Sequence, residues 1–153
     1  MLPFFADYFQ RLQELHQSIQ WSIAGLPQTA LDWVPGEEMN SLNVLVVHLC
    51  GAERYWIGDV VGQSPSDRDR ESEFQQHGWE AARLEKLLQE TLAHTRSVLE
   101  KLSLQDLETQ RTSSRDGHDY SVGWALAHAL EHTALHTGHI QITRDLWDHR
   151  ASD

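Results

Sequence analysis

Four long stretches of the sequence repeat apolar side chains at intervals of three and four residues, and this periodicity limits the folds open to the chain. The stretches cover residues 4–24, 41–61, 79–102 and 121–147. No segment alternates convincingly between polar and apolar residues, so we predict no sheet. Four amphipathic helices bury their apolar stripes most simply against one another. The sequence therefore predicts an all-α four-helix bundle in a single domain spanning residues 1–150.

The breaks between these stretches are marked by residues that commonly begin helices and by polar connectors. Ser41 and Ser121 precede the second and fourth helices, and a serine side chain can accept a hydrogen bond from the first turn of a helix. The connectors 63–77 and 109–120 are polar, and we predict solvated loops there. Residues 104–107 are expected to form a short extra turn.

Charge and composition exclude several functions. The net charge is −11 with histidine neutral, which argues against a nucleic-acid surface and against a basic membrane-binding surface. No apolar run reaches transmembrane length, and the apolar start lacks the basic region of a signal peptide. The single cysteine, Cys50, cannot form an internal disulfide, so we predict a cytoplasmic protein.

Histidines are concentrated on the last predicted helix. His128, His132, His136 and His139 follow one another at steps of three or four residues, and His132 and His136 fall within the apolar stripe. Side chains four residues apart on a helix reach the same point beside it, so such a pair can chelate one metal ion. This spacing predicts that His132 and His136 are metal ligands.

A third ligand must come from another helix, because a zinc-type site needs at least three protein ligands. His48 is the best candidate, since it lies on the apolar face of the second helix. Three imidazoles would leave a position open for water or substrate. Zn²⁺ or Ni²⁺ is the expected metal, and Cu²⁺ or Co²⁺ would also fit on affinity order alone. The competing interpretation is that these histidines are hydrogen-bonded core residues.

Several other residues are further candidates for a role at this site. His128 could replace His132 as a ligand, and either His128 or Glu53 could close the site as a fourth ligand. His139 and Glu53 are candidates for moving protons. The motif His-x-x-Glu-His at 128–132 also occurs in inverted zinc peptidases, but few residues follow to supply their usual distant ligand. The remaining histidines lie in polar stretches and are expected to be solvated: His16, His77, His94, His118 and His149.

Two stretches of the sequence resemble the DinB-like (damage-inducible) family. Residues 128–140, which end in His-Thr-Gly-His-Ile, resemble the family's signature helix, and residues 43–56 resemble its second helix. The resemblance implies a four-helix bundle with a three-histidine metal site, whose ligands here would be His48, His132 and His136. It also implies that homodimers are common among relatives.

The activity implied by the resemblance is thiol chemistry. Characterised relatives include thiol-dependent S-transferases, a mycothiol-dependent maleylpyruvate isomerase and domains of sulfoxide-forming enzymes. We therefore hypothesise a metal-dependent transferase that acts on a small-molecule thiol and an electrophile. Two alternatives stay open at this point: a non-catalytic, stress-associated metal-binding bundle, and a metal-dependent hydrolase that activates water.

Overall fold

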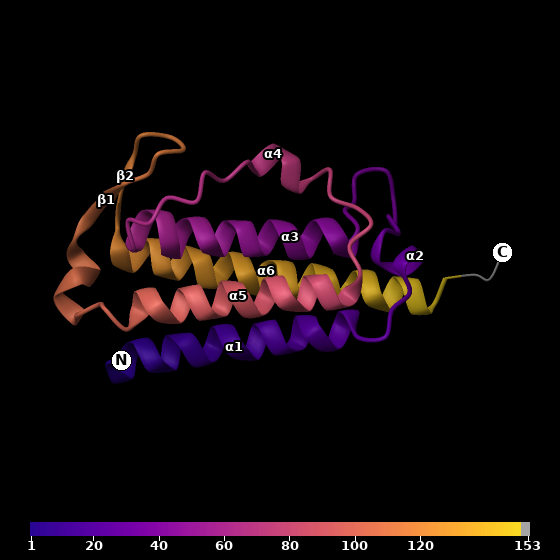
Figure 1. The fold of residues 1–153 in the computed structure, drawn as a ribbon, viewed down its shortest axis with the longest axis horizontal. Helices are drawn as coiled ribbons and strands as arrows, with labels where there is room; N and C mark the ends of the chain where they lie inside the picture. The colour runs from indigo at the N-terminus through magenta and orange to yellow at the C-terminus, as the bar shows by residue number, and fades with distance from the viewer. Residues whose placement is uncertain (151–153) are drawn as a thin grey trace.

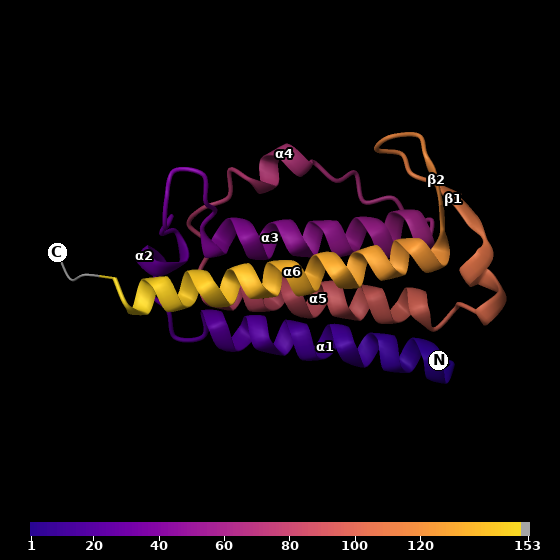
Figure 2. The same cartoon turned by 180° about the vertical axis from the view of Figure 1, so that it is seen from behind.

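The computed structural model describes residues 1–150, and four long helical segments form its body (Figures 1 and 2). They are α1 (Pro3–Ile23), α3 (Leu42–Glu53) continued by η1 (Arg54–Val61), α5 (Ala81–Leu99) and α6 (Val122–Asp148). The prediction of an all-α four-helix bundle is confirmed. In the described part of the chain, no helix is both long enough and apolar enough to cross a membrane.

Serine caps begin two of these helices, as predicted. The Ser41 side chain accepts a hydrogen bond from the Val44 N–H at 3.3 Å, and Ser121 accepts one from the Trp124 N–H at 3.1 Å. Each cap satisfies a backbone donor that the first turn of a helix leaves without a partner. The two caps fix where the histidine-bearing helices α3 and α6 start.

The second helix changes its winding after Glu53. Residues Arg54–Val61 form a π-helix, and the Gly62 N–H donates to the carbonyl of Ile57 five residues earlier at 2.9 Å. π-Helical turns are rare in proteins overall, and those that do occur are often found at functional sites. Here the wider turns carry Tyr55 and Trp56, which both line cavities described below.

The buried apolar side chains form two clusters, one toward each end of the bundle. One cluster includes Leu12, Tyr55 and Val98, and the other includes Ile19 and Leu88. Polar side chains occupy the level between them. Along α1, α3 and α5 the apolar core is therefore interrupted by a buried polar layer.

His16, Glu53 and Thr95 make up this polar layer. His16 Nε2 lies 2.7 Å from a carboxylate oxygen of Glu53, and the Thr95 hydroxyl donates to the other oxygen at 2.7 Å. His16 is only 1% exposed, so the prediction that it is solvated was wrong. On the buried face of α1, His16 lies between Leu12 and Ile19. The polar residues next to it in the sequence hide this buried position. His94 is also partly buried, whereas the other three histidines predicted to be solvated are exposed.

The connectors contain more structure than their composition predicted. Segment 63–77 includes the short helix α4 (Arg70–Glu73), and segment 109–120 includes an antiparallel pair, β1 (Gln110–Thr112) and β2 (Asp119–Ser121). The prediction of no sheet was therefore wrong, because strands of three residues are too short to show alternation. The remaining short elements are α2 (Gln28–Leu31) and η2 (Leu104–Glu108), the latter at the predicted extra turn. Both polar connectors lie against the α3 side of the bundle (Figure 1).

The contacts in the polar layer lead to a prediction of how stability changes when one of its residues is replaced. His16→Leu leaves the buried Glu53 carboxylate without its histidine partner, so we expect the free energy of unfolding to fall by about 3 kcal/mol. The double variant His16→Leu/Glu53→Met removes the stranded carboxylate and should be more stable than His16→Leu alone. Urea denaturation followed by circular dichroism measures both, with the exposed His77→Leu as control. Equal stability of His16→Leu and wild type would contradict this role.

Candidate metal centre

Three histidines meet where α3 packs on α6. His48 comes from α3, and His132 and His136 come from consecutive turns of α6. One ring nitrogen from each lies within 4.8 Å of one nitrogen of the others. The ring centroids are 5.1 Å apart for His48 and His132, 5.0 Å for His48 and His136, and 4.4 Å for His132 and His136. The structure thus brings together the three residues predicted as ligands.

The electrostatics of the cluster keep two of its rings neutral. Burial lowers the pKa of His132 to about 3, with further lowering by the nearby His136 and His48. Burial likewise lowers the pKa of His136 to about 4, together with His48 and His139. The Nδ1 atoms of His132 and His136 are buried and have no hydrogen-bond partner among the described residues. Neutral imidazoles with unused nitrogens are the form in which histidine binds metals, so the donor set fits a divalent ion.

Glu73, in α4, orients the third ring. Its carboxylate accepts a hydrogen bond from His48 Nδ1 at 2.9 Å and two from Arg68, at 2.6 Å to Nε and 2.8 Å to Nη2. Burial would raise the pKa of Glu73, but the hydrogen bonds from Arg68 and His48 outweigh it and hold that pKa below its usual range. Because a carboxylate only accepts, His48 donates through Nδ1 and keeps Nε2 free for a cation. This carboxylate–histidine arrangement is typical of metal sites.

Gly51 makes room for this carboxylate against α3. A Cβ atom at this position would lie 2.1 Å from Oε1 of Glu73 and 3.2 Å from Nε of Arg68. Real Cβ atoms essentially never lie as close as 2.1 Å to another atom, so any side chain here must displace the Glu73 carboxylate. The glycine is therefore explained by the approach of α4 to the candidate site.

A cavity of about 250 Å³ adjoins the cluster. It is lined by His48 and His132 together with Ala52, Trp56, His128 and three arginines. A three-histidine site beside a cavity can offer an open coordination position, as catalytic sites do. The described residues place no carboxylate within the cluster itself.

The other candidate residues, His128, His139 and Glu53, lie outside the three-histidine cluster. His128 stacks on Trp124 with ring centroids 4.9 Å apart, and its ring lies 6.1 Å from that of His132. His139 is exposed and lines a different cavity, near Met39. The Glu53 carboxylate is engaged by His16 and Thr95.

Sequence reasoning missed Glu73, Arg68 and the arginines of the hairpin and α4. They lie in connectors that were predicted to be solvated loops, and charged residues in such loops are normally solvent-exposed. The only available signal was the unusual density of arginine and acidic residues at 67–73, which is equally typical of a solvated loop.

Comparison with known proteins places the chain in a family. The sequence model for mycothiol-S-transferases matches residues 8–149. The chain belongs to this family. The match and the structural neighbours also confirm the resemblance to DinB-like proteins. No curated protein matches the sequence.

Three solved structures share the fold of this mycothiol-S-transferase family member at low sequence identity. A conserved protein from Enterococcus faecalis superposes with a TM-score of 0.82 at 15% identity, covering 98% of this chain and 100% of its own. The DinB-like protein YjoA from Bacillus subtilis gives 0.68 at 17% identity, covering 97% and 94%. YfiT from Bacillus subtilis, described as a probable metal-dependent hydrolase with an unusual four-helix bundle topology, gives 0.77 at 14% identity, covering 97% and 90%.

The lowered pKa values predict the pH dependence of stability in metal-free protein. His132 and His136 resist protonation when folded, so protons bind first to the unfolded chain. Stability should therefore fall as pH drops from about 6.5, the unfolded histidine value, toward about 4. The variant His132→Gln/His136→Gln should lose less stability over this range. Thermal melts of both proteins at intervals from pH 7 to pH 4 test this, and parallel curves would contradict it.

Gly51 provides a test of the Glu73 contact that leaves Glu73, Arg68 and the three histidines themselves in place. Gly51→Ala should leave helix stability unchanged or higher, because alanine is the better helix former, yet it must displace the Glu73 carboxylate. Loss of such a contact typically weakens metal binding by about 10–100-fold. Competition with a chelator measures the affinity, and Gly138→Ala, where nothing lies within 4 Å, is the matched control. Equal affinities for both variants would exclude the proposed role of Glu73.

Proposed function

We propose that the protein is a metal-dependent transferase that joins a small thiol to an electrophile. His48, His132 and His136 would hold the metal, with zinc or nickel as the expected ion. The observation that carries the proposal is the cluster of three imidazoles, two of them kept uncharged by burial, beside a cavity of about 250 Å³. The family match supports thiol transfer as the reaction class.

A divalent ion in such a site supplies a Lewis-acidic position that favours the ionised form of a thiol or of water. The protein's own residues then have separate tasks. Glu73 holds the His48 ring in one orientation, and Arg68 holds Glu73. Trp56 and Ala52 supply the apolar part of the cavity wall.

His128 is the best placed group to accept the thiol proton. It lines the same cavity as His48 and His132, whereas His139 lines another one and Glu53 is engaged elsewhere. The thiol proton passes to the His128 imidazole, the sulfur forms a bond to the electrophilic carbon, and the electron pair of the broken bond leaves with the displaced group. We therefore propose His128 in place of His139 or Glu53 for proton transfer; this role, the cytoplasmic location and the homodimer all stay predictions.

Hydrolysis is the second candidate, because YfiT, which shares the fold, is described as a probable metal-dependent hydrolase. The same open position could serve water instead of a thiol. A non-catalytic metal-binding bundle is the third candidate. The reaction products distinguish the three candidates. A transferase forms a thioether, a hydrolase forms a hydrolysed ester or amide, and a non-catalytic bundle forms no product.

Metal content and turnover test this proposal together. We expect untagged wild type to carry about one zinc or nickel ion per chain, because three imidazoles form a complete donor set. The variant His132→Ala/His136→Ala should carry none, while His149→Ala, at the exposed end of α6, should match wild type. Elemental mass spectrometry measures the ion, and loss of a chromogenic electrophile in the presence of thiol measures transfer.

Two outcomes would contradict the proposal. Wild type that takes up neither zinc nor nickel when either is added would exclude the metal site. A metal-loaded protein that cleaves esters at the same rate with and without thiol, and forms no thioether, would favour hydrolysis.

A further inference from the structure

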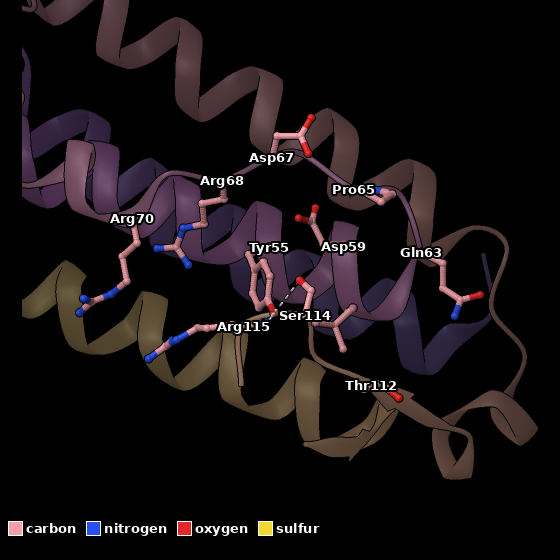
Figure 3. Close-up of a pocket in the computed structure, with 11 residues that line it drawn as sticks. Tyr55, Asp59, Gln63, Pro65, Asp67, Arg68, Arg70, Thr112, Ser114 and Arg115 are labelled. Carbon is pink, nitrogen blue, oxygen red and sulfur yellow. Dashed lines mark hydrogen bonds between the residues drawn. The ribbon is translucent and has the colours of Figure 1, made fainter. Parts of the chain in front are cut away.

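Three arginines from two connectors converge beside the candidate metal centre. Arg68, Arg70 and Arg115 line the cavity that adjoins the histidine cluster, and they also line a larger neighbouring cavity of about 550 Å³. Figure 3 shows their side chains lying on the same side of Tyr55. The guanidinium groups therefore stand where the two cavities join.

Much of the positive charge at this junction has no partner within the protein. Arg68 uses Nε and Nη2 to bind Glu73, and its Nη1 has no hydrogen bond among the described residues. The Arg68 side chain is only 9% exposed, so its unused donors favour a ligand or water that accepts from them. Arg70 and Arg115 form no ion pair with any carboxylate in residues 1–150.

The carboxylates that belong to the same region do not neutralise the junction. Asp59 and Asp67 line the larger cavity, but Asp59 is bound by Arg54 at 2.7 Å, and Asp67 points away from the three guanidinium groups in Figure 3. Asp116, in the hairpin loop, accepts a hydrogen bond from the Tyr120 hydroxyl at 3.0 Å. The junction is therefore a positive site with its own carboxylates directed elsewhere.

Two aromatic rings support the arginines of the first connector. Cζ of Arg68 lies 5.9 Å from the centre of the Tyr55 ring, and Cζ of Arg70 lies 5.0 Å from the centre of the Phe74 ring. Guanidinium groups are attracted to the faces of such rings. The centre of the Phe74 ring in turn lies 4.7 Å from that of His48. Arg70 is therefore held one ring away from a candidate metal ligand.

Hydrogen bonds hold the loop of the third arginine in place. The Tyr55 hydroxyl accepts from the Arg115 N–H at 3.1 Å and bonds to the Ser113 hydroxyl at 2.8 Å. A π-helical residue thus anchors the hairpin loop that presents Arg115. Such anchoring lowers the ordering cost of binding an anion.

We propose that Arg70 and Arg115, with Nη1 of Arg68, form a binding site for a small molecule that carries a carboxylate or phosphate group. Guanidinium groups match the oxygens of both groups in paired hydrogen bonds. The anionic group would lie at the junction, and the larger cavity, whose volume is typical of small-molecule sites, would hold the rest of the molecule. Because this site needs neither a bound metal nor a thiol, it is independent of the proposed function.

A small anion suits this site better than a nucleic acid does. The chain has a net charge of −11, and the exposed residues Asp67, Asp69 and Asp116 lie in the same two connectors as the arginines. A polyanion that reached the junction would also approach these carboxylates and be repelled by them. A small anion can contact the guanidinium groups alone.

Isothermal titration of metal-free protein with succinate and, separately, with inorganic phosphate tests the anion site directly. At least one of the two should bind wild type, and the tighter one identifies the class of anion. Binding should weaken as sodium chloride rises from about 50 to about 300 mM, because salt screens exposed charges. Arg70→Ala/Arg115→Ala should weaken it by about tenfold or more, since it removes two charged partners. Arg68 is left intact because it holds Glu73.

Two further variants separate a built site from general electrostatic attraction. Arg11→Ala/Arg96→Ala removes exposed arginines of α1 and α5, changes the net charge equally and should bind like wild type. Arg70→Lys/Arg115→Lys keeps both positive charges but loses the paired hydrogen bonds of guanidinium, so it should bind the preferred anion about threefold or more weakly than wild type.

Wild type that binds neither succinate nor phosphate overturns the proposal. So does equal binding by the Arg70→Ala/Arg115→Ala variant, or wild-type affinity in the lysine variant. A short single-stranded RNA that binds more tightly than either small anion would overturn the small-molecule class. Because no metal or thiol is present, a negative result here leaves the proposed function standing, and a protein that takes up no metal can still bind the anion.

Discussion

Burying a ring nitrogen in an apolar bundle without a partner is costly, and this constraint organises the structure around His48, His132 and His136. Each uncompensated polar atom costs free energy, because it gives up water and gains nothing in return. The protein meets this cost for His48 with Glu73, which in turn requires Arg68 and the open space at Gly51. For His132 and His136, one nitrogen each stays unmet within the protein, and a bound cation is the partner that would complete the cluster.

The same constraint explains the division of the hydrophobic core. In the polar layer, His16 Nε2 and the Thr95 hydroxyl both bond to the Glu53 carboxylate, and only His16 Nδ1 lacks a partner among the described residues. The histidine cluster differs because three imidazoles meet there, two of them with an unpartnered Nδ1, and because it adjoins a cavity. The bundle thus contains two buried polar clusters: one is centred on the Glu53 carboxylate and contributes to stability, and the other adjoins a cavity that a ligand can enter.

Helical periodicity was sufficient to predict the bundle, because each long helix buries a stripe that is visible in the sequence. It also singled out the three histidines, since His132 and His136 fall one turn apart within such a stripe and His48 falls within another. It could not reveal Glu73 or Arg115, because a residue in a connector has no period that indicates which way it points. It failed for His16 because the polar side chains around it disguised a core position. The partners of a site were therefore harder to predict than the site itself.

The connectors supply the charged residues that surround the imidazoles of the candidate site. The helices α3 and α6 supply the imidazoles, while α4 and the hairpin supply the carboxylate that orients one of them and the arginines that surround the cavity. A rigid bundle that presents function through its loops is a common arrangement.

X-ray absorption spectroscopy at the edge of the bound metal, recorded before and after a thiol is added, tests the central claim most directly. The account predicts three nitrogen neighbours at about 2.0–2.1 Å from imidazole, and after thiol addition one sulfur neighbour at about 2.3 Å. A fourth protein ligand in the starting spectrum, or a spectrum that thiol leaves unchanged, would contradict a site that is open to a thiol.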